Sequence, residues 1–220
     1  MSLQISTPNH HPSDAMLLDF ASGAARIEHA RVLAAHVGSC PVCRAAVATA
    51  EAAGGVLLDT LEPAVMGDDA LNRALAALDR PLPQAAPQEA TTEMPDWIAV
   101  SPDVVEAAMR RRRWAAPGVW VAPISNDRKS GRRSYLLRVA PGMAVPHHGH
   151  RGTELTVILK GAFVDDGVEF AAGDFAEVGD EVEHRPHVTR QSECVCLVAA
   201  DAPLVPLDWV GRMFQPFVRI

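Results

Sequence analysis

Two histidines and a glutamate stand close together between Gly142 and Gly161. His148 and His150 are two residues apart in a segment expected to be extended, and alternate residues of a strand point to one face. The alternation in Thr153–Leu159 predicts the following strand, and Glu154 near its start can reach the same ion. Such ligands suit zinc, iron, manganese or nickel, and the spacing does not choose among them. The alternative is a surface-loop histidine cluster without metal.

This spacing, GX5HXHX3EX6G, resembles the first motif of the cupin family at every fixed position. The second cupin motif, GX5PXGX2HX3N, begins at Gly173 and places His184 at the family's metal-ligand position. Three other positions differ, because the chain has Gly179, Glu181 and Val188 where the motif has proline, glycine and asparagine. The resemblance therefore implies a cupin β-barrel, with a turn before its fourth ligand that is built differently. The implied ligands are His148, His150, Glu154 and His184.

A second candidate site lies near the N-terminus, at His36, Cys40 and Cys43. The cysteines have CxxC spacing, and the proline between them suits the first position of a helix, so both thiols would face the positive end of the helix dipole. His36 would end the preceding helix and point to the same place. A tetrahedral zinc site needs a fourth ligand, and His10 and His11 are available upstream. His29 is the other candidate, although it would lie in the middle of a helix.

The CxxC spacing alone leaves two alternatives open. It is also the spacing of a thioredoxin-like redox pair, and two such cysteines can simply be small core residues. The segment lacks the strand and helix that surround the thioredoxin motif. These features favour zinc binding over redox chemistry.

Length, composition and charge restrict the possible functions. A chain of 220 residues with 48% hydrophobic content can bury one large core or two small ones. We expect no membrane span, no secretory signal and a cytoplasmic location, where four cysteines are thiols or ligands rather than disulfides. The net charge of −7 argues against direct binding to nucleic acid.

The chain is expected to divide at a proline-rich segment. Each proline removes a backbone donor and fixes its own backbone, so this segment cannot be a helix interior or a central strand. Alanine-rich helical periodicity precedes it, and short apolar strands separated by turns follow it. The predicted fold class is a multidomain α plus all-β protein. It comprises a small zinc-bound helical bundle (1–80), a linker (81–96) and a cupin β-barrel of the jelly-roll type (97–220).

Four helices are expected in the first domain. Ser13 would cap the first, which would end at Gly23. The second would span Ala24 to Val37 and end with Gly38 in a left-handed conformation. The third would begin at Pro41 and continue toward Ala53, before a flexible glycine pair. The fourth would follow Asp68 and Asp69.

The two motifs, in this order, resemble the ChrR-type zinc-binding anti-sigma factors of bacteria. The similarity extends over HHPSDAMLL, HVGSCPVC, PHHGHRGTELTVILKGAF, EVEHRP, ECVCL and QPFVRI, and so over most of the chain. It implies that His11 completes the first zinc site, and no ligand position of the family pattern is replaced. The implied helical-domain ligands are His11, His36, Cys40 and Cys43.

The resemblance also implies a function. Such a protein holds an extracytoplasmic-function sigma factor inactive through its helical domain. It releases that sigma factor, and so regulates transcription, when the cupin domain responds to singlet oxygen or organic hydroperoxides. Apolar residues left over from the small bundle would meet the partner, or else complete the bundle core. These residues are Leu57, Leu58, Leu71, Leu75 and Leu78.

Charge and oligomeric state add to this expectation. Residues 1–95 hold eleven acidic and five basic side chains, so this part is acidic and suits a partner with basic faces. Charge would steer this association more than stabilise it. We expect no direct nucleic-acid contact, and a homodimer through the barrel is possible because cupins often dimerise.

A metal-dependent cupin enzyme such as a dioxygenase is the rival hypothesis. No general base or substrate pocket is identifiable beyond the ligands, and a dioxygenase has no use for the N-terminal motif. Cys194 and Cys196 would face one side of a strand, as core residues or as thiols oxidised during signalling. His147 and His187 flank ligand positions and would either support the ligands or face solvent.

Overall fold

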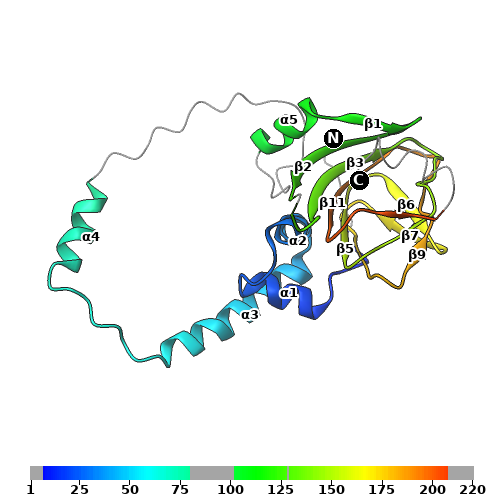
Figure 1. Cartoon of the computed structure of the whole chain (residues 1–220). Helices are drawn as coiled ribbons and strands as arrows, with labels where there is room; N and C mark the ends of the chain where they lie inside the picture. The colour runs from blue at the N-terminus through cyan, green and yellow to red at the C-terminus, as the bar shows by residue number, and fades with distance from the viewer. Residues whose placement is uncertain (1–6, 80–101, 128, 208–220) are drawn as a thin grey trace, which may run out of the picture.

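The computed structural model describes residues 7–79, 102–127 and 129–207. The predicted order, a helical N-terminal region followed by a cupin-like β-sandwich, is confirmed (Figure 1). The helices of the described chain are α1 (Asp14–Ala21), α2 (Ile27–Ser39), α3 (Pro41–Asp59), α4 (Ala70–Leu78) and α5 (Pro102–Arg110). The predicted linker 81–96 lies outside the described residues, and the proposed domain limits remain a prediction.

All strand pairs between the named strands are antiparallel. A six-stranded sheet has the order β1-β2-β3-β11-β5-β8, and two three-stranded sheets have the orders β10-β6-β7 and β12-β4-β9. The strands are β1 (Arg113–Ala116), β2 (Val119–Asn126), β3 (Arg133–Val139), β4 (His148–Gly149), β5 (Glu154–Lys160), β6 (Ala162–Asp165), β7 (Val168–Ala171), β8 (Phe175–Val178), β9 (Glu183–His184), β10 (His187–Val188), β11 (Cys194–Ala200) and β12 (Val205–Pro206).

The large sheet is buried on both faces. Along β11, Cys196 and Val198 point into the sandwich interior, whereas Leu197 and Ala199 point to a second core that includes α2 and α5. This double burial explains why β11 is apolar throughout instead of alternating with polar residues. The helical region and the barrel therefore share a continuous core.

The first helix begins and ends as predicted. The Ser13 hydroxyl accepts a hydrogen bond from the Met16 N–H at 3.4 Å, and Gly23 adopts φ +74° just beyond the helix. The fourth helix also begins at the expected place, directly after Asp69.

The predicted end of the second helix is wrong. Gly38 belongs to α2 and does not adopt a left-handed conformation. The helix ends instead at Ser39, and Cys40 after it has an extended backbone, with φ −100° and ψ 111°. The reason is the next residue, Pro41, because the ring of a proline excludes the preceding residue from the helical region. Pro41 then occupies the first turn of α3, as predicted.

The third helix is longer than predicted, because it continues through Gly54 and Gly55 to Asp59. Each glycine costs about 1 kcal/mol relative to alanine in a helix. The alanine-rich sequence before the glycines and the apolar residues after them continue the helix despite this cost. By length and composition α3 could also cross a membrane, although Arg44 and Glu51 lie within it.

The expected four-helix bundle is not formed. Helices α1, α2 and α3 pack around the predicted N-terminal ligands, and α2 also packs on β5 and β11 of the large sheet. Helix α4 stands away from the barrel and from the other helices (Figure 1) and has no buried residue. Three helices and one face of the barrel, rather than four helices, thus enclose the N-terminal cluster.

Candidate metal centres

The structure brings the four N-terminal candidates together at the junction of α1, α2 and α3. His11 Nδ1 lies 3.4 Å from both Cys40 Sγ and Cys43 Sγ, and His36 Nε2 lies 3.3 Å from Cys43 Sγ. Tetrahedral zinc with bonds of about 2.0–2.3 Å separates its ligand atoms by about 3.3–3.8 Å. These distances therefore fit zinc.

Hydrogen bonding fixes the orientation of the His36 ring. Its Nδ1 lies 2.8 Å from the Gly173 carbonyl oxygen, which can only accept a hydrogen bond, so Nδ1 carries the proton. The Nε2 lone pair then faces the two cysteines. This is the arrangement by which proteins usually orient a metal-binding histidine.

Ionisation of the two N-terminal thiols is unfavourable unless a cation is bound beside them. Cys40 and Cys43 are both buried and reduced. Burial is the largest cause that raises the pKa of Cys43 to about 12, and the nearby Cys40 thiol is the next. A bound cation would favour the deprotonated form of both cysteines instead, because it stabilises the two thiolates. The thiols are not a surface redox pair, since each is at most 2% exposed.

The two other histidines of the region have different partners. His10 Nδ1 lies 3.2 Å from Asp174 Oδ2, and His29 Nε2 lies 3.3 Å from Asp201 Oδ1. Neither is part of the cluster, so geometry selects His11 as the fourth candidate ligand.

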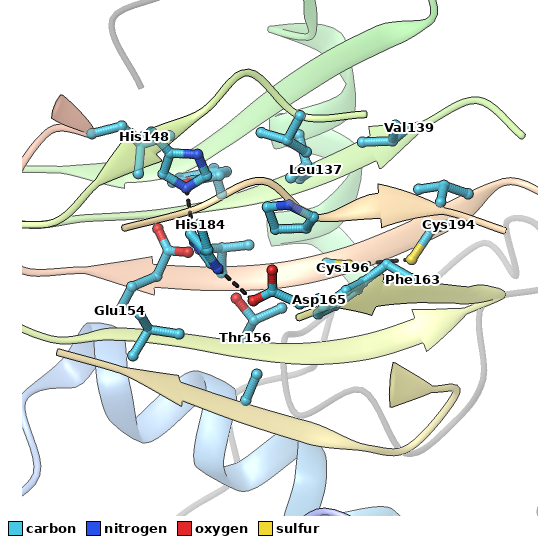
Figure 2. Close-up of a pocket in the computed structure, with 18 residues that line it drawn as sticks. Leu137, Val139, His148, Glu154, Thr156, Phe163, Asp165, His184, Cys194 and Cys196 are labelled. Atoms are coloured by element: carbon cyan, nitrogen blue, oxygen red, sulfur yellow. Dashed lines mark hydrogen bonds and ion pairs between the residues drawn. The ribbon is translucent and has the colours of Figure 1, made fainter. Parts of the chain in front are cut away.

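The cupin candidates also come together, and three of them, His148, Glu154 and His184, line one cavity of the barrel (Figure 2). His148 belongs to β4 and His184 to its partner β9, and these residues are directly paired across the two strands. His150 follows β4, and Glu154 begins β5. His184 Nε2 lies 2.9 Å from His150 Nε2 and 3.1 Å from His148 Nε2.

The tautomers of these histidines leave lone pairs facing each other. His148 Nδ1 donates to the Pro146 carbonyl at 2.7 Å, and His184 Nδ1 donates to Asp165 Oδ2 at 2.5 Å (Figure 2). The pKa of His148 is lowered to about 4, mainly by burial, so this ring is neutral at pH 7. Both Nε2 atoms therefore present lone pairs at close range, an arrangement that a shared cation stabilises.

Glu154 completes the donor set. Its Oε2 is buried and has no hydrogen-bond partner among the described residues. Burial raises the pKa of Glu154 to about 7, and a bound cation would offset the cost of burying the ionised carboxylate. Three imidazoles and a carboxylate fit zinc, and they fit iron, manganese or nickel equally well.

A cavity of about 70 Å³ adjoins this cluster inside the barrel. Its polar end has His148, Glu154 and His184, and most of its remaining lining is apolar. Cys194 and Cys196 line it as well, with sulfurs 3.5 Å apart (Figure 2). They are buried core residues, so core packing alone accounts for their positions, as the sequence allowed.

Residues beside the candidate ligands have different degrees of exposure. His147 is half-buried and His187 is exposed, and neither belongs to a cluster. Sequence reasoning missed Asp165, which orients His184, and Tyr135, a buried phenol with Glu154 close enough to raise its pKa. Burial is the largest cause of that shift. No spacing signal connects either residue with its partner, because each lies on a different strand.

Comparisons with known proteins agree on one family. Residues 102–202 match the family model described as the ChrR cupin-like domain. The anti-sigma-E factor ChrR of Cereibacter sphaeroides is 36% identical over 215 residues, which cover 97% of this chain and 100% of that protein. The crystal structure of Rhodobacter sphaeroides SigE in complex with the anti-sigma ChrR matches with a TM-score of 0.76 and 36% identity. That match covers 89% of this chain and 100% of the other.

Proposed function

Because the chain belongs to the ChrR family of anti-sigma factors, which are regulators and not enzymes, we propose that it binds and inactivates an extracytoplasmic-function sigma factor. The related ChrR was crystallised in complex with SigE, which supports a sigma factor as the partner. The observation that carries the proposal is an exposed surface of α3 and α4. We call it the leucine surface; it comprises Leu57, Leu58, Leu71, Leu75 and Leu78.

The leucine surface has no cover within the described chain. Its five side chains are 52–80% exposed, and five further apolar residues of the same region are also open to solvent. Exposed apolar side chains in this number usually mark a protein-binding site. The five further residues are Val56, Leu61, Val65, Met66 and the Ile27 that begins α2.

Helix α4 gains no stability from burial against the other described residues. It has nine residues and no buried side chain, whereas an isolated helix shorter than about 12–15 residues is marginal in water. Its leucines at positions 71, 75 and 78 form one helical face. A partner with an apolar groove would supply the burial that α4 lacks.

The N-terminal cluster supports the binding surface. Zinc held by His11, His36, Cys40 and Cys43 would supply folding energy to a small core. The side chains that pack beside these ligands are few, chiefly Leu17 and Val47. Removal of a ligand should therefore loosen α1 and α3, and with them the leucine surface.

The barrel is proposed as the sensor. His148, His150, Glu154 and His184 would hold its metal, and the adjoining cavity would admit a small oxidant or ligand. Singlet oxygen or an organic hydroperoxide is the proposed signal, carried over from the family resemblance. Cytoplasmic location and a homodimer through the barrel complete the proposal.

Co-purification tests the proposal. Tagged full-length protein is co-expressed with candidate extracytoplasmic-function sigma factors, and we expect stoichiometric capture of one of them. The double variant Leu75→Ser, Leu78→Ser should lose capture, because it makes the exposed apolar face of α4 polar. Val168→Ser on β7 is the matched control, since Val168 is 45% exposed on the barrel and should not matter. The proposal is wrong if no sigma factor is captured, or if both sets of variants bind equally.

The sensing role needs its own measurement. The complex is exposed to an organic hydroperoxide or to photochemically generated singlet oxygen, and release of the sigma factor is followed. Glu154→Gln, which removes the carboxylate of the cupin cluster, should suppress release. Equal release from the original chain and this variant would contradict the assignment of the cluster as sensor.

A further inference from the structure

Two carboxylates of the barrel contact the helical region and are not among the candidate ligands of either cluster. Asp174, in the turn between β7 and β8, is only 2% exposed. Asp201 directly follows β11. Both residues contact segments that lie more than 160 positions earlier in the chain. The contacts of Asp174 lead directly to a candidate zinc ligand.

Asp174 holds the segment that precedes His11. Its Oδ1 accepts hydrogen bonds from the backbone N–H groups of Asn9 at 2.6 Å and His10 at 3.1 Å. Its Oδ2 accepts from the Ala171 N–H at 2.8 Å and lies 3.2 Å from His10 Nδ1. The Phe175 N–H donates to the His10 carbonyl at 3.1 Å. The backbone on which His11 depends is therefore fixed by the barrel.

The same turn holds His36. The Gly173 carbonyl accepts from His36 Nδ1 at 2.8 Å, and the Phe175 ring packs edge-on against the imidazole, with 5.5 Å between centroids. Gly173 has φ +96°, and a Cβ there would lie 3.1 Å from Pro8 Cγ. Glycine is thus required both for the turn and for the close approach of the N-terminal segment.

The turn is also bonded to the strand that carries Glu154. The Gly173 N–H donates to the Ile158 carbonyl at 2.8 Å, and the Ile158 N–H donates to the Asp174 carbonyl at 3.0 Å. Glu154 and Ile158 both belong to β5 and are about 13 Å apart at about 3.3 Å per residue. Strand β5 therefore runs from the cupin cluster to the turn that holds the histidines of the other cluster.

A second contact ties the opposite end of α2 to the same strand. Asp201 Oδ2 accepts from the Thr153 N–H, next to Glu154, at 3.1 Å. Asp201 also accepts from Arg26 at 2.9 Å, at the start of α2. Between these ends α2 packs its buried face on the sheet, so the helix and β5 must move together.

We propose that the barrel is an integral part of the N-terminal metal site. The turn Gly173–Phe175 positions both histidines, with Asp174 as the key positioning residue, whereas the cysteines are positioned by α3 itself. Strand β5 then transmits a displacement at Glu154 to His36 without any need for the linker. The positioning of the N-terminal site by the barrel concerns the free protein and does not depend on the proposed function. Only the use of this coupling to regulate sigma-factor release rests on the proposed function.

The test uses the full-length protein without a sigma factor, loaded with cobalt(II). Thiolate-to-cobalt charge-transfer absorption reports only the N-terminal cluster, because the cupin cluster has no cysteine. The rate at which this absorption disappears in excess chelator is then measured. We expect Asp174→Ala to accelerate the loss about 10-fold, the lower end of the effect of removing a ligand's own hydrogen-bond partner, because Asp174 holds the backbone before His11 and not a ligand itself.

Two further variants separate positioning from general damage. Asp174→Asn keeps one acceptor oxygen and should give a smaller acceleration of cobalt loss. If Asp174→Ala does not fold, the rate of Asp174→Asn serves as the test of the proposal. Glu193→Ala is the matched control, because Glu193 bonds Arg138 and Lys160 within the barrel and should leave the rate unchanged. A wild-type rate in both Asp174 variants, or equal acceleration in Glu193→Ala, overturns the proposal.

The link through β5 has a separate readout. Glu154→Gln lies in the other cluster and should still accelerate cobalt loss from the N-terminal cluster, by about 2- to 30-fold, the range usual for coupling between distant sites. An unchanged rate overturns the transmission through β5. Since no sigma factor is present, failure of sigma-factor capture cannot be confused with either result.

Discussion

Truncation of Leu33 to alanine should destabilise the protein, because it leaves a cavity in the core between α2 and the large sheet. Leu33 is fully buried on α2, in the core shared with Leu155, Val157 and Leu197 of the large sheet. Buried leucine-to-alanine changes cost about 2.7–5 kcal/mol, depending on how far the site collapses. The surrounding strands are held by their own ladders and cannot collapse freely, so we expect a loss of about 3 kcal/mol or more.

Leu57→Ala on α3 is the matched control. It removes the same atoms, but Leu57 is 69% exposed, so the free energy of unfolding should change by less than about 0.5 kcal/mol. In sigma-factor binding the order should be reversed, with Leu57→Ala having the larger effect and Leu33→Ala the smaller one. Leu57 belongs to the leucine surface and should be needed for capture, whereas Leu33 has no exposed surface to contribute.

Urea unfolding followed by circular dichroism measures the first effect, and thermal unfolding provides a check. For a protein of this size a loss of about 3 kcal/mol lowers Tm by about 6–12 °C. If the free energy of unfolding of Leu33→Ala lies within about 0.5 kcal/mol of that of the original chain, the packing of α2 on the sheet is wrong. If Leu57→Ala is as destabilised as Leu33→Ala, the exposed leucine surface is wrong.

Three other predictions concern metal, positioning and pH. His36→Ala should remove about one zinc ion per chain and make Cys40 and Cys43 reactive toward thiol reagents; unchanged zinc content would exclude His36 as a ligand. Asp165→Asn should weaken metal binding in the barrel about 10- to 100-fold in a metal titration, while exposed Asp166→Asn should not. Burial lowers the pKa of His29 below 6.5, against an opposing effect of Asp201, so folded His29 resists protonation. Stability should therefore fall as pH drops from 6.5 through the folded pKa, by at most about 1.4 kcal/mol per pH unit, and His29→Gln should reduce this slope in urea titrations. Parallel slopes for the two chains would show that His29 does not titrate in this way.

The sequence by itself determined the features that depend on spacing within one element. Ser13 caps α1, Pro41 begins α3, and the residues expected as ligands do come together in two clusters. Short spacings are informative because neighbours on one helix or strand share a face whatever the rest of the chain does. The same local reasoning failed at Gly54 and Gly55, where the helical preference of their surroundings prevailed.

Only the tertiary structure decided how the two regions meet. The carbonyl of Gly173 bonds His36 across 137 positions of sequence, and Asp201 reaches Arg26 across 175. A backbone carbonyl leaves no trace in residue type, and a single ion pair has no periodicity, so no pattern could predict either contact. The apolar runs of β5 and β11 fit their burial on both faces, but nothing in these runs indicates that α2 covers one of them. Which surface a buried face meets depends on the packing of the whole chain, and among the described residues this packing leaves α4 apart from the other helices and the barrel (Figure 1).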